Sequence, residues 1–174
     1  MARHLTLSLA LLAGTVACSE QIPELRRADV EAAVGDASSD LELVDIGCPD
    51  VDELGPIPEG DFVPIVCTGL LGGDEVILDA VLIRAGAESV EVTVAVSTPI
   101  LDVSTVEVDA AARLDADLGG SPMVRCAQSW VVVRVGREIS CRVTAEGGTA
   151  GPVDQPAVVR ILDVDGGWEL DLTP

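Results

Sequence analysis

The sequence predicts an α+β protein of two tandem modules, each with one helix packed on a three- to four-stranded antiparallel sheet and one disulfide. Three observations predict this arrangement. Four cysteines fall as one pair in each half of the chain, at Cys48 and Cys67 and at Cys126 and Cys141. A helical pattern precedes each pair, and segments rich in Val and Ile alternate between apolar and polar residues around it. The same order of features therefore occurs twice, in residues 23–98 and in residues 99–174.

In the first module, a helix is expected over residues 23–34. Pro23 suits the first turn of a helix, and Glu24 is favourable near its positive end. A Pro- and Gly-rich loop over residues 55–60 and a turn at Gly72 and Gly73 separate the segments that follow. We expect strands in residues 41–46, 62–67, 76–83 and 90–96.

In the second module, a helix is expected over residues 105–118. Ser104 and Glu107 have the spacing of a capping box at its start, and Gly119 is a natural stop. Asp165, Gly166 and Gly167 predict a hairpin turn. We expect strands in residues 123–126, 130–135, 139–141, 158–164 and 168–172.

The cysteine spacing predicts two structural disulfides. The two pairs are separated by 19 and 15 residues, and neither has the C-x-x-C spacing of redox-active thiols. A module of about 75 residues has a small hydrophobic core. A disulfide that closes a loop of 15 to 19 residues adds about 3 kcal/mol to its free energy of unfolding. We expect Cys48–Cys67 and Cys126–Cys141, because the other pairings would cross-link the two modules.

The first residues have the pattern of an export signal. Arg3 and His4 precede an apolar stretch over residues 5–13, which is too short to span a membrane, and small residues fill 14–17. Residues 1–17 are therefore expected to be a cleaved signal peptide. The sequence Thr15-Val16-Ala17-Cys18 resembles a bacterial lipobox, whose cysteine is lipidated and becomes the new N-terminus.

Cysteine parity supports lipidation of Cys18, because the other four cysteines can pair and the fifth would otherwise be a free thiol. Residues 18–22 are then a short lipidated tether, and we expect an extracytoplasmic protein held on the cell membrane by this lipid. The alternative is an ordinary secreted protein with an unpaired Cys18.

Composition excludes several kinds of chemistry. After residue 17 the chain has no His, Lys or Tyr, so a Ser–His–Asp arrangement, a His-based zinc site and Schiff-base chemistry are all excluded. We therefore expect no catalytic residue, no metal and no cofactor. A hydrolase that works with a pair of carboxylates is the remote alternative.

The chain is strongly acidic. It has 30 Asp and Glu residues against 10 basic ones, a net charge of −20. Residues 18–98 hold eighteen acids and three Arg, and residues 99–174 hold twelve acids and six Arg. This balance argues against nucleic acid as a ligand and suits an envelope protein with a basic surface as the partner.

One predicted loop, between Cys48 and Phe62, is rich in carboxylates. It is a candidate contact for a basic partner or a cation such as calcium, and a calcium- or cation-binding envelope protein is the alternative function. A second acidic group, Asp163 and Asp165 before Gly166, is expected to be a β-turn rather than a calcium loop, because Gly167 occupies the third ligand position. The residues of the first loop are Asp50, Asp52, Glu53, Glu59 and Asp61.

The motifs resemble those of small lipoproteins of high-GC Gram-positive bacteria whose secreted domain has no assigned function. The resemblance rests on Cys48-Pro49-Asp50, on Ile65-Val66-Cys67-Thr68 with the following Gly pair, and on a divergent second copy around Cys126 and Cys141. It covers most of the chain after residue 17. It implies an envelope lipoprotein.

The tandem layout, with one disulfide per repeat, also resembles that of the beta-lactamase inhibitory protein. That resemblance implies a protein-binding sheet surface lined with aromatic side chains. Phe62, Trp130 and Trp168 are the candidates in this chain. We therefore expect a non-catalytic module that binds an envelope protein through its sheet faces or its acidic loop.

Overall fold

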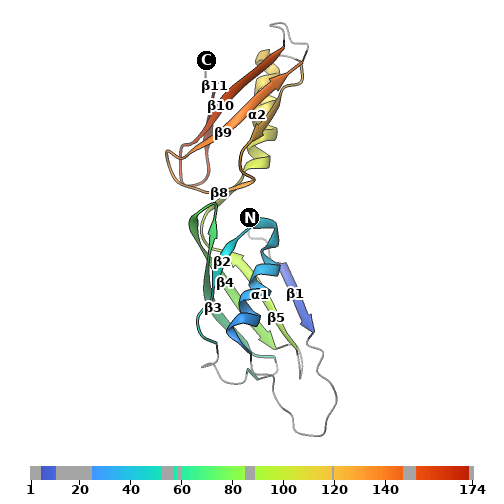
Figure 1. Cartoon of the computed structure of the whole chain (residues 1–174), viewed down its shortest axis with the longest axis vertical. Helices are drawn as coiled ribbons and strands as arrows, with labels where there is room; N and C mark the ends of the chain where they lie inside the picture. The colour runs from blue at the N-terminus through green and yellow to red at the C-terminus, as the bar shows by residue number, and fades with distance from the viewer. Residues whose placement is uncertain are drawn as a thin grey trace. The chain divides into compact units, whose positions relative to one another are not determined.

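The computed structural model describes residues 5–10, 25–51, 57–58, 60–84, 89–118, 120–146 and 152–172. The chain divides into two compact units, Met1–Thr98 and Pro99–Pro174, and each combines a helix with antiparallel strands (Figure 1). The expected α+β class is confirmed. Among the described residues, no helix is long and apolar enough to cross a membrane.

The first unit contains a five-stranded sheet in the order β1-β5-β4-β3-β2, with every pair antiparallel. This sheet has more strands than expected, because part of the predicted leader adds β1 at one edge, next to β5 (Figure 1). The other expected strands are present, and β3 and β4 extend beyond the predicted limits. The elements are β1 (Leu5–Ala10), α1 (Arg27–Ala37), β2 (Val44–Gly47), β3 (Phe62–Leu71), β4 (Asp74–Arg84) and β5 (Ser89–Val96).

Helix α1 covers one face of this sheet and buries a narrow apolar stripe made of Val30, Ala33, Val34 and Ala37. The predicted start of this helix was too early, because Arg26 is extended and the helix begins at Arg27. Beneath the helix, every second residue of β3 and β4 is buried, which is the period-two pattern of a sheet with one covered face.

The predicted strand over residues 41–46 was partly wrong. Residues Ser39–Leu41 form a 3-10 turn, and Leu41 is buried there. Glu42 has a positive φ angle of 54°, which an extended strand does not contain, so strand β2 starts only at Val44. Asp45, within β2, has a φ of 53°, and the register with β3 shifts between Val44 and Gly47. Apolar alternation carries no signal for such backbone reversals.

The second unit has a four-stranded antiparallel sheet in the order β11-β10-β9-β7 and a separate two-stranded pair, β6 with β8. Strand β6 was not predicted, and β8 is shorter than the expected 130–135. The elements are β6 (Ile100–Asp102), α2 (Val103–Leu118), β7 (Met123–Cys126), β8 (Trp130–Val132), β9 (Glu138–Ala145), β10 (Val153–Ile161) and β11 (Trp168–Leu172).

Helix α2 starts two residues before the expected position and packs its buried residues onto the sheet, with Val106 and Ala110 in the core. The predicted capping box was wrong. Asp102 is the capping residue, because its Oδ1 accepts the Ser104 backbone N–H at 3.0 Å. Glu107 makes different contacts, described below.

The turn between β10 and β11 is confirmed, and it accounts for the shifted end of β10. The Asp163 carboxylate accepts the backbone N–H groups of Asp165, at 3.0 Å, and of Gly167, at 2.7 Å. Strand β10 therefore ends at Ile161 and not at residue 164, since the chain from Asp163 onward folds around this side chain.

Candidate functional site

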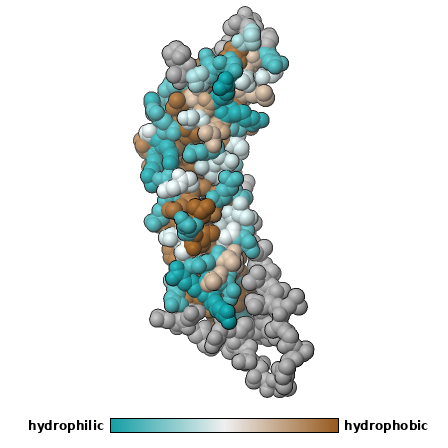
Figure 2. All heavy atoms as spheres, in the orientation of Figure 1, coloured by the Kyte–Doolittle hydropathy of each residue, from teal (hydrophilic) through white to brown (hydrophobic). Residues whose placement is uncertain are grey.

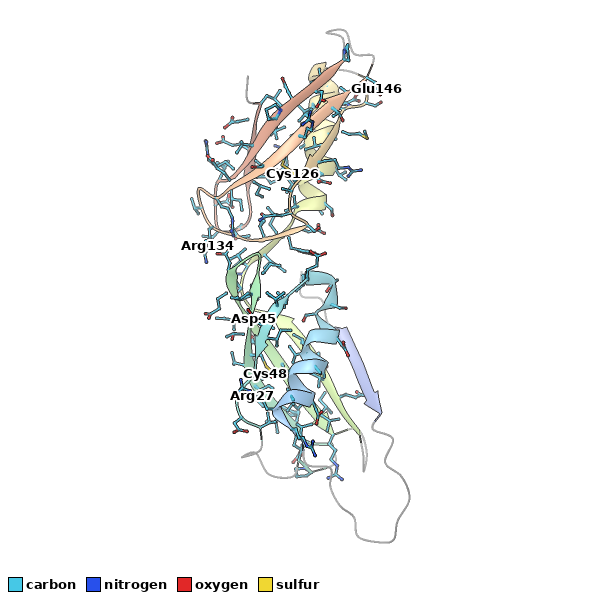
Figure 3. All side chains as sticks on the ribbon, viewed as in Figure 1. Arg27, Asp45, Cys48, Cys126, Arg134 and Glu146 are labelled. Carbon is cyan, nitrogen blue, oxygen red and sulfur yellow. A yellow bond between two sulfur atoms is a disulfide. The ribbon has the colours of Figure 1, made fainter. Side chains whose placement is uncertain are left out.

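Both expected disulfides are confirmed. Cys48 is bonded to Cys67 with an S–S distance of 2.07 Å, and Cys126 is bonded to Cys141 with a distance of 2.04 Å. Figure 3 labels Cys48 in the first unit and Cys126 in the second. In both units a carboxylate from the helix also accepts a hydrogen bond from the backbone N–H of the first cysteine.

In the first unit this carboxylate belongs to Glu31 of α1. Its Oε1 accepts the Cys48 backbone N–H at 3.1 Å and the Arg27 Nε–H at 2.7 Å. The hydrogen bond from Arg27, followed by the one from Cys48, lowers the pKa of Glu31 below its ordinary value. The helix is therefore bonded to the first cysteine of the disulfide.

In the second unit Glu107 of α2 has the same role. Its Oε1 accepts the Cys126 backbone N–H at 2.6 Å, and its Oε2 pairs with Arg125 Nη1 at 3.1 Å. The Glu107 side chain is only 15% exposed, whereas Arg125 is 76% exposed. The hydrogen bond to Cys126 is consequently the contact that is sheltered from water.

The face of the first sheet opposite α1, called the open face below, carries exposed apolar side chains. Phe62 is 70% exposed, Val66 is 58% exposed and Ile77 is 43% exposed. The register places Phe62 opposite Ile83 of β4 and Pro64 opposite Val81, so the apolar residues adjoin one another across β3 and β4. Apolar residues (brown) reach the surface of the first unit among polar ones (teal) in Figure 2.

The charged residues that β3, β4 and β5 place on this open face are all negative. Along β3, β4 and β5, the residues on this side include Glu75, Asp79 and Glu91 but no Arg. Asp79 lies between Val66 of β3 and Ala95 of β5 in the register, at the side of the apolar residues. An apolar surface bordered by carboxylates is complementary to an apolar surface bordered by basic groups.

The corresponding face of the second sheet is charged. Arg142 of β9 binds Asp154 of β10 through two hydrogen bonds, of 2.6 and 2.8 Å. Arg160 of β10 pairs with Glu138 at 2.9 Å and with Glu169 at 3.1 Å. Acidic and basic groups thus neutralise one another on this face, which differs from the open face of the first unit.

The acidic loop predicted from the sequence is only partly described. Asp50 and Asp61 are exposed at its two ends, and Asp52, Glu53 and Glu59 lie outside the described residues. Within the described part of the chain, no group of three or more His, Cys, Asp or Glu side chains could hold a metal ion. Cys18, the expected lipidation site, also lies outside the described residues.

The three aromatic candidates lie in different surroundings. Phe62 is on the open face, as expected of a binding residue. Trp168 packs against the core of the second unit, and the Arg113 guanidinium lies 4.3 Å from the centre of its ring. Trp130 is half-buried in β8, opposite Asp102. Only Phe62 therefore presents most of its surface to solvent.

Sequence reasoning missed the exposed apolar neighbours of Phe62. The run Phe62-Val63-Pro64-Ile65-Val66 is apolar at every position, whereas a half-covered strand alternates. Because Ile65 and Cys67 face the core, Val66 between them faces outward, and Phe62 and Pro64 share that side by alternation. This continuous run was the signal for an apolar open face.

The comparisons with known proteins give no relative: the chain matches no protein-family model, no curated protein and no solved structure.

Proposed function

We propose that this chain is an exported, lipid-anchored envelope protein that binds a partner protein through the open face of its first sheet. The observation that carries the proposal is the exposed apolar group of Phe62, Val66 and Ile77 on a sheet whose other face buries the alternate residues of β3 and β4. Exposed apolar groups bordered by polar residues are typical of protein-interaction surfaces. The role is non-catalytic, in keeping with a chain that has no His or Lys after residue 17.

We also propose that the two units are tandem copies of one module. The support is a hydrogen bond that occurs in both units, although an α+β unit does not require it. In each unit a helical glutamate, Glu31 or Glu107, accepts the backbone N–H of the first disulfide cysteine, Cys48 or Cys126. In both units the helix is thus bonded to the first disulfide cysteine in the same way, whereas the sheet faces opposite the helices differ in chemistry. Binding is assigned to the unit with the apolar face.

The exposed side chains can supply a useful part of the binding free energy. Full burial of a Phe or Val side chain is worth about 1.5–3 kcal/mol. Phe62 is 70% exposed, so its burial by a partner would contribute about 1–2 kcal/mol, and Val66 would contribute about 1 kcal/mol. Together they account for an affinity difference of roughly 30- to 150-fold.

The carboxylates indicate the character of the partner. Glu75, Asp79 and Glu91 border the apolar residues, and the chain as a whole has a net charge of −20. A partner with basic groups around an apolar centre would be attracted, and an acidic partner would be repelled. The proposal therefore specifies a basic envelope protein.

The lipid anchor has its own test. We propose that Cys18 carries the lipid after removal of residues 1–17. Replacing it, Cys18→Ser, is expected to move the protein from the membrane pellet to the medium. If the variant stays in the membrane fraction as firmly as the parent, the anchor proposal is wrong.

The binding proposal is tested by cross-linking in intact cells. The chain contains no Lys, so the reagent should be a carbodiimide that joins its carboxylates to amines of a neighbour. One dominant envelope protein is expected, and it should be lost from the double variant Phe62→Ser/Val66→Ser.

The matched control is Met123→Ser/Val135→Ser, which removes two similarly exposed apolar side chains from the second unit. It should retain the cross-linked product. Equal yields from the two double variants would contradict the assignment to the open face. Circular dichroism of both variants would verify that they remain folded.

A further inference from the structure

Strand β5 has two neighbours, β4 on one side and β1 on the other, and only β4 belongs to the processed protein. The antiparallel register of β1 with β5 runs over six residue pairs, from Leu5 opposite Val94 to Ala10 opposite Ser89. β1 lies within residues 1–17, which the proposed function removes. Export would therefore leave the outer edge of β5 without its strand.

The backbone of β5 presents regularly spaced groups at that edge. The Ser97 N–H donates to the Ile77 carbonyl of β4 at 2.9 Å, so the backbone groups of Ser97 point toward β4. Residues alternate in direction along an antiparallel strand. The N–H and C=O groups of Val90, Val92 and Val94 therefore point toward β1, where their register partners are Leu9, Leu7 and Leu5.

We propose that this edge of β5, once residues 1–17 are removed, accepts an extended segment of a partner protein as an added antiparallel strand. The segment carries a branched apolar residue at every second position and small polar residues between them. This inference rests on the leader removal in the proposed function and adds a second contact, separate from the open face. Strand addition of this kind joins backbone hydrogen bonds to side-chain recognition at alternate positions.

The chemistry of the segment follows from what surrounds the edge. On the helix side, Val92 and Val94 are buried, and the register puts an incoming residue beside each of them. On the other side lie Glu91 and Thr93, which face Ser8 and Thr6 in the register. Apolar residues thus suit one side of the added strand and small polar residues the other. Strand β1 has this pattern, with Leu, Thr, Leu, Ser and Leu in sequence.

A partner's segment fits the edge better than a second copy of this chain. Helix α1 packs beside both β5 and β1, so it extends over the place of the added strand. Antiparallel pairing of β5 with the β5 of another copy would put two α1 helices over the same junction. A helix is about 10 Å wide and adjacent strands are about 4.8 Å apart, so the two helices would compete for one position. A single extended segment brings no helix.

The test uses a synthetic peptide of residues 2–10, labelled with a fluorophore, and the processed protein purified from membranes in detergent. The unprocessed chain, with β1 still attached, is the control. We expect fluorescence anisotropy to show binding to the processed protein and at least tenfold weaker binding to the unprocessed chain, because β1 already occupies the edge. Equal binding to both forms would overturn the inference.

Two modified peptides separate strand addition from apolar adhesion. N-methylation at Leu7 removes the N–H that faces Val92, whereas N-methylation at Ser8 removes an N–H that points away from β5. The side chains are unchanged, so the two peptides should partition equally into detergent micelles. We expect the first to bind roughly fivefold to tenfold more weakly than the second, as the loss of one backbone hydrogen bond implies. Equal affinities would rule out strand addition.

The mass of the protein isolated from the envelope distinguishes failure of this inference from failure of the proposed function. A mass that includes residues 1–17 would refute leader removal, whatever the peptides do. A processed mass with no peptide binding would refute the acceptor edge alone. A dimer of the processed protein that is dispersed by the peptide would show that a second copy occupies the edge, and it would overturn the assignment to a partner's segment.

Discussion

Replacing Glu107 by Ala should destabilise the protein strongly, although Glu107 takes no part in a buried core. Its carboxylate accepts the Cys126 N–H at 2.6 Å and is only 15% exposed. A hydrogen bond to a charged group is worth about 1.5–3 kcal/mol, and a lost acceptor leaves the N–H unsatisfied. The Arg125 ion pair adds little, because Arg125 is largely exposed. We expect a loss of about 2 kcal/mol.

Thermal unfolding of the full chain with its disulfides intact measures this loss. For a unit of this size, 1 kcal/mol corresponds to about 4–8 °C in Tm, so Glu107→Ala should lower the transition by about 8–15 °C. Glu107→Gln keeps an uncharged acceptor and should lose about half as much. Asp109→Ala, an exposed position on the same helix, is the control. A Tm for Glu107→Ala within about 2 °C of this control would refute the reasoning.

Three further outcomes are expected. Removing the second disulfide with Cys126→Ala/Cys141→Ala should cost about 3 kcal/mol, because it frees a loop of 15 residues, and urea unfolding under oxidising conditions would measure it. The pKa of Glu31 is lowered in the folded state, so its contribution is present above its ordinary value of 4.5 and is lost as pH falls through the folded pKa. The parent should therefore lose more stability than Glu31→Gln on acidification below about pH 5, as followed by melting temperature. Calcium at about 1 mM should leave the melting temperature unchanged, whereas a rise of several degrees would favour the cation-binding alternative over the protein-binding one.

Local patterns were sufficient to predict both disulfides and most of the strands. Cysteine parity and proximity fixed Cys48–Cys67 and Cys126–Cys141, because only nearby pairings avoid linking the two halves of the chain. Strands β7 and β11 have the predicted limits, and residues typical of turns precede each of them, Gly120 to Pro122 before β7 and Asp165 to Gly167 before β11. Such features depend on residues that are close in the sequence, so a local sequence pattern is sufficient to predict them.

The features that were missed depend on long-range or backbone effects. Ser104 and Glu107 have capping-box spacing, yet Glu107 is drawn away by an N–H nineteen residues distant, and Asp102 caps the helix instead. The positive φ of Glu42 delays the start of β2 to Val44, although the apolar alternation already begins at Leu41. Strand β1 was not expected, because an apolar segment of this length is typical of an export signal as well as of a β-strand. Its pairing with β5 depends on residues that are far away in the sequence.

The faces of the two sheets that lie opposite the helices differ in chemistry. On the second sheet, Arg142 and Arg160 form ion pairs with carboxylates on neighbouring strands. On the first sheet, Val66 and Ile77 expose apolar area that water disfavours, with Glu75 and Asp79 beside them, and Asp79 accepts a hydrogen bond from Ser97 Oγ. In the proposed function, a partner with an apolar centre bordered by basic groups would cover this apolar area. This difference in chemistry is the reason why we propose the first sheet, and not the second, as the one that binds another protein.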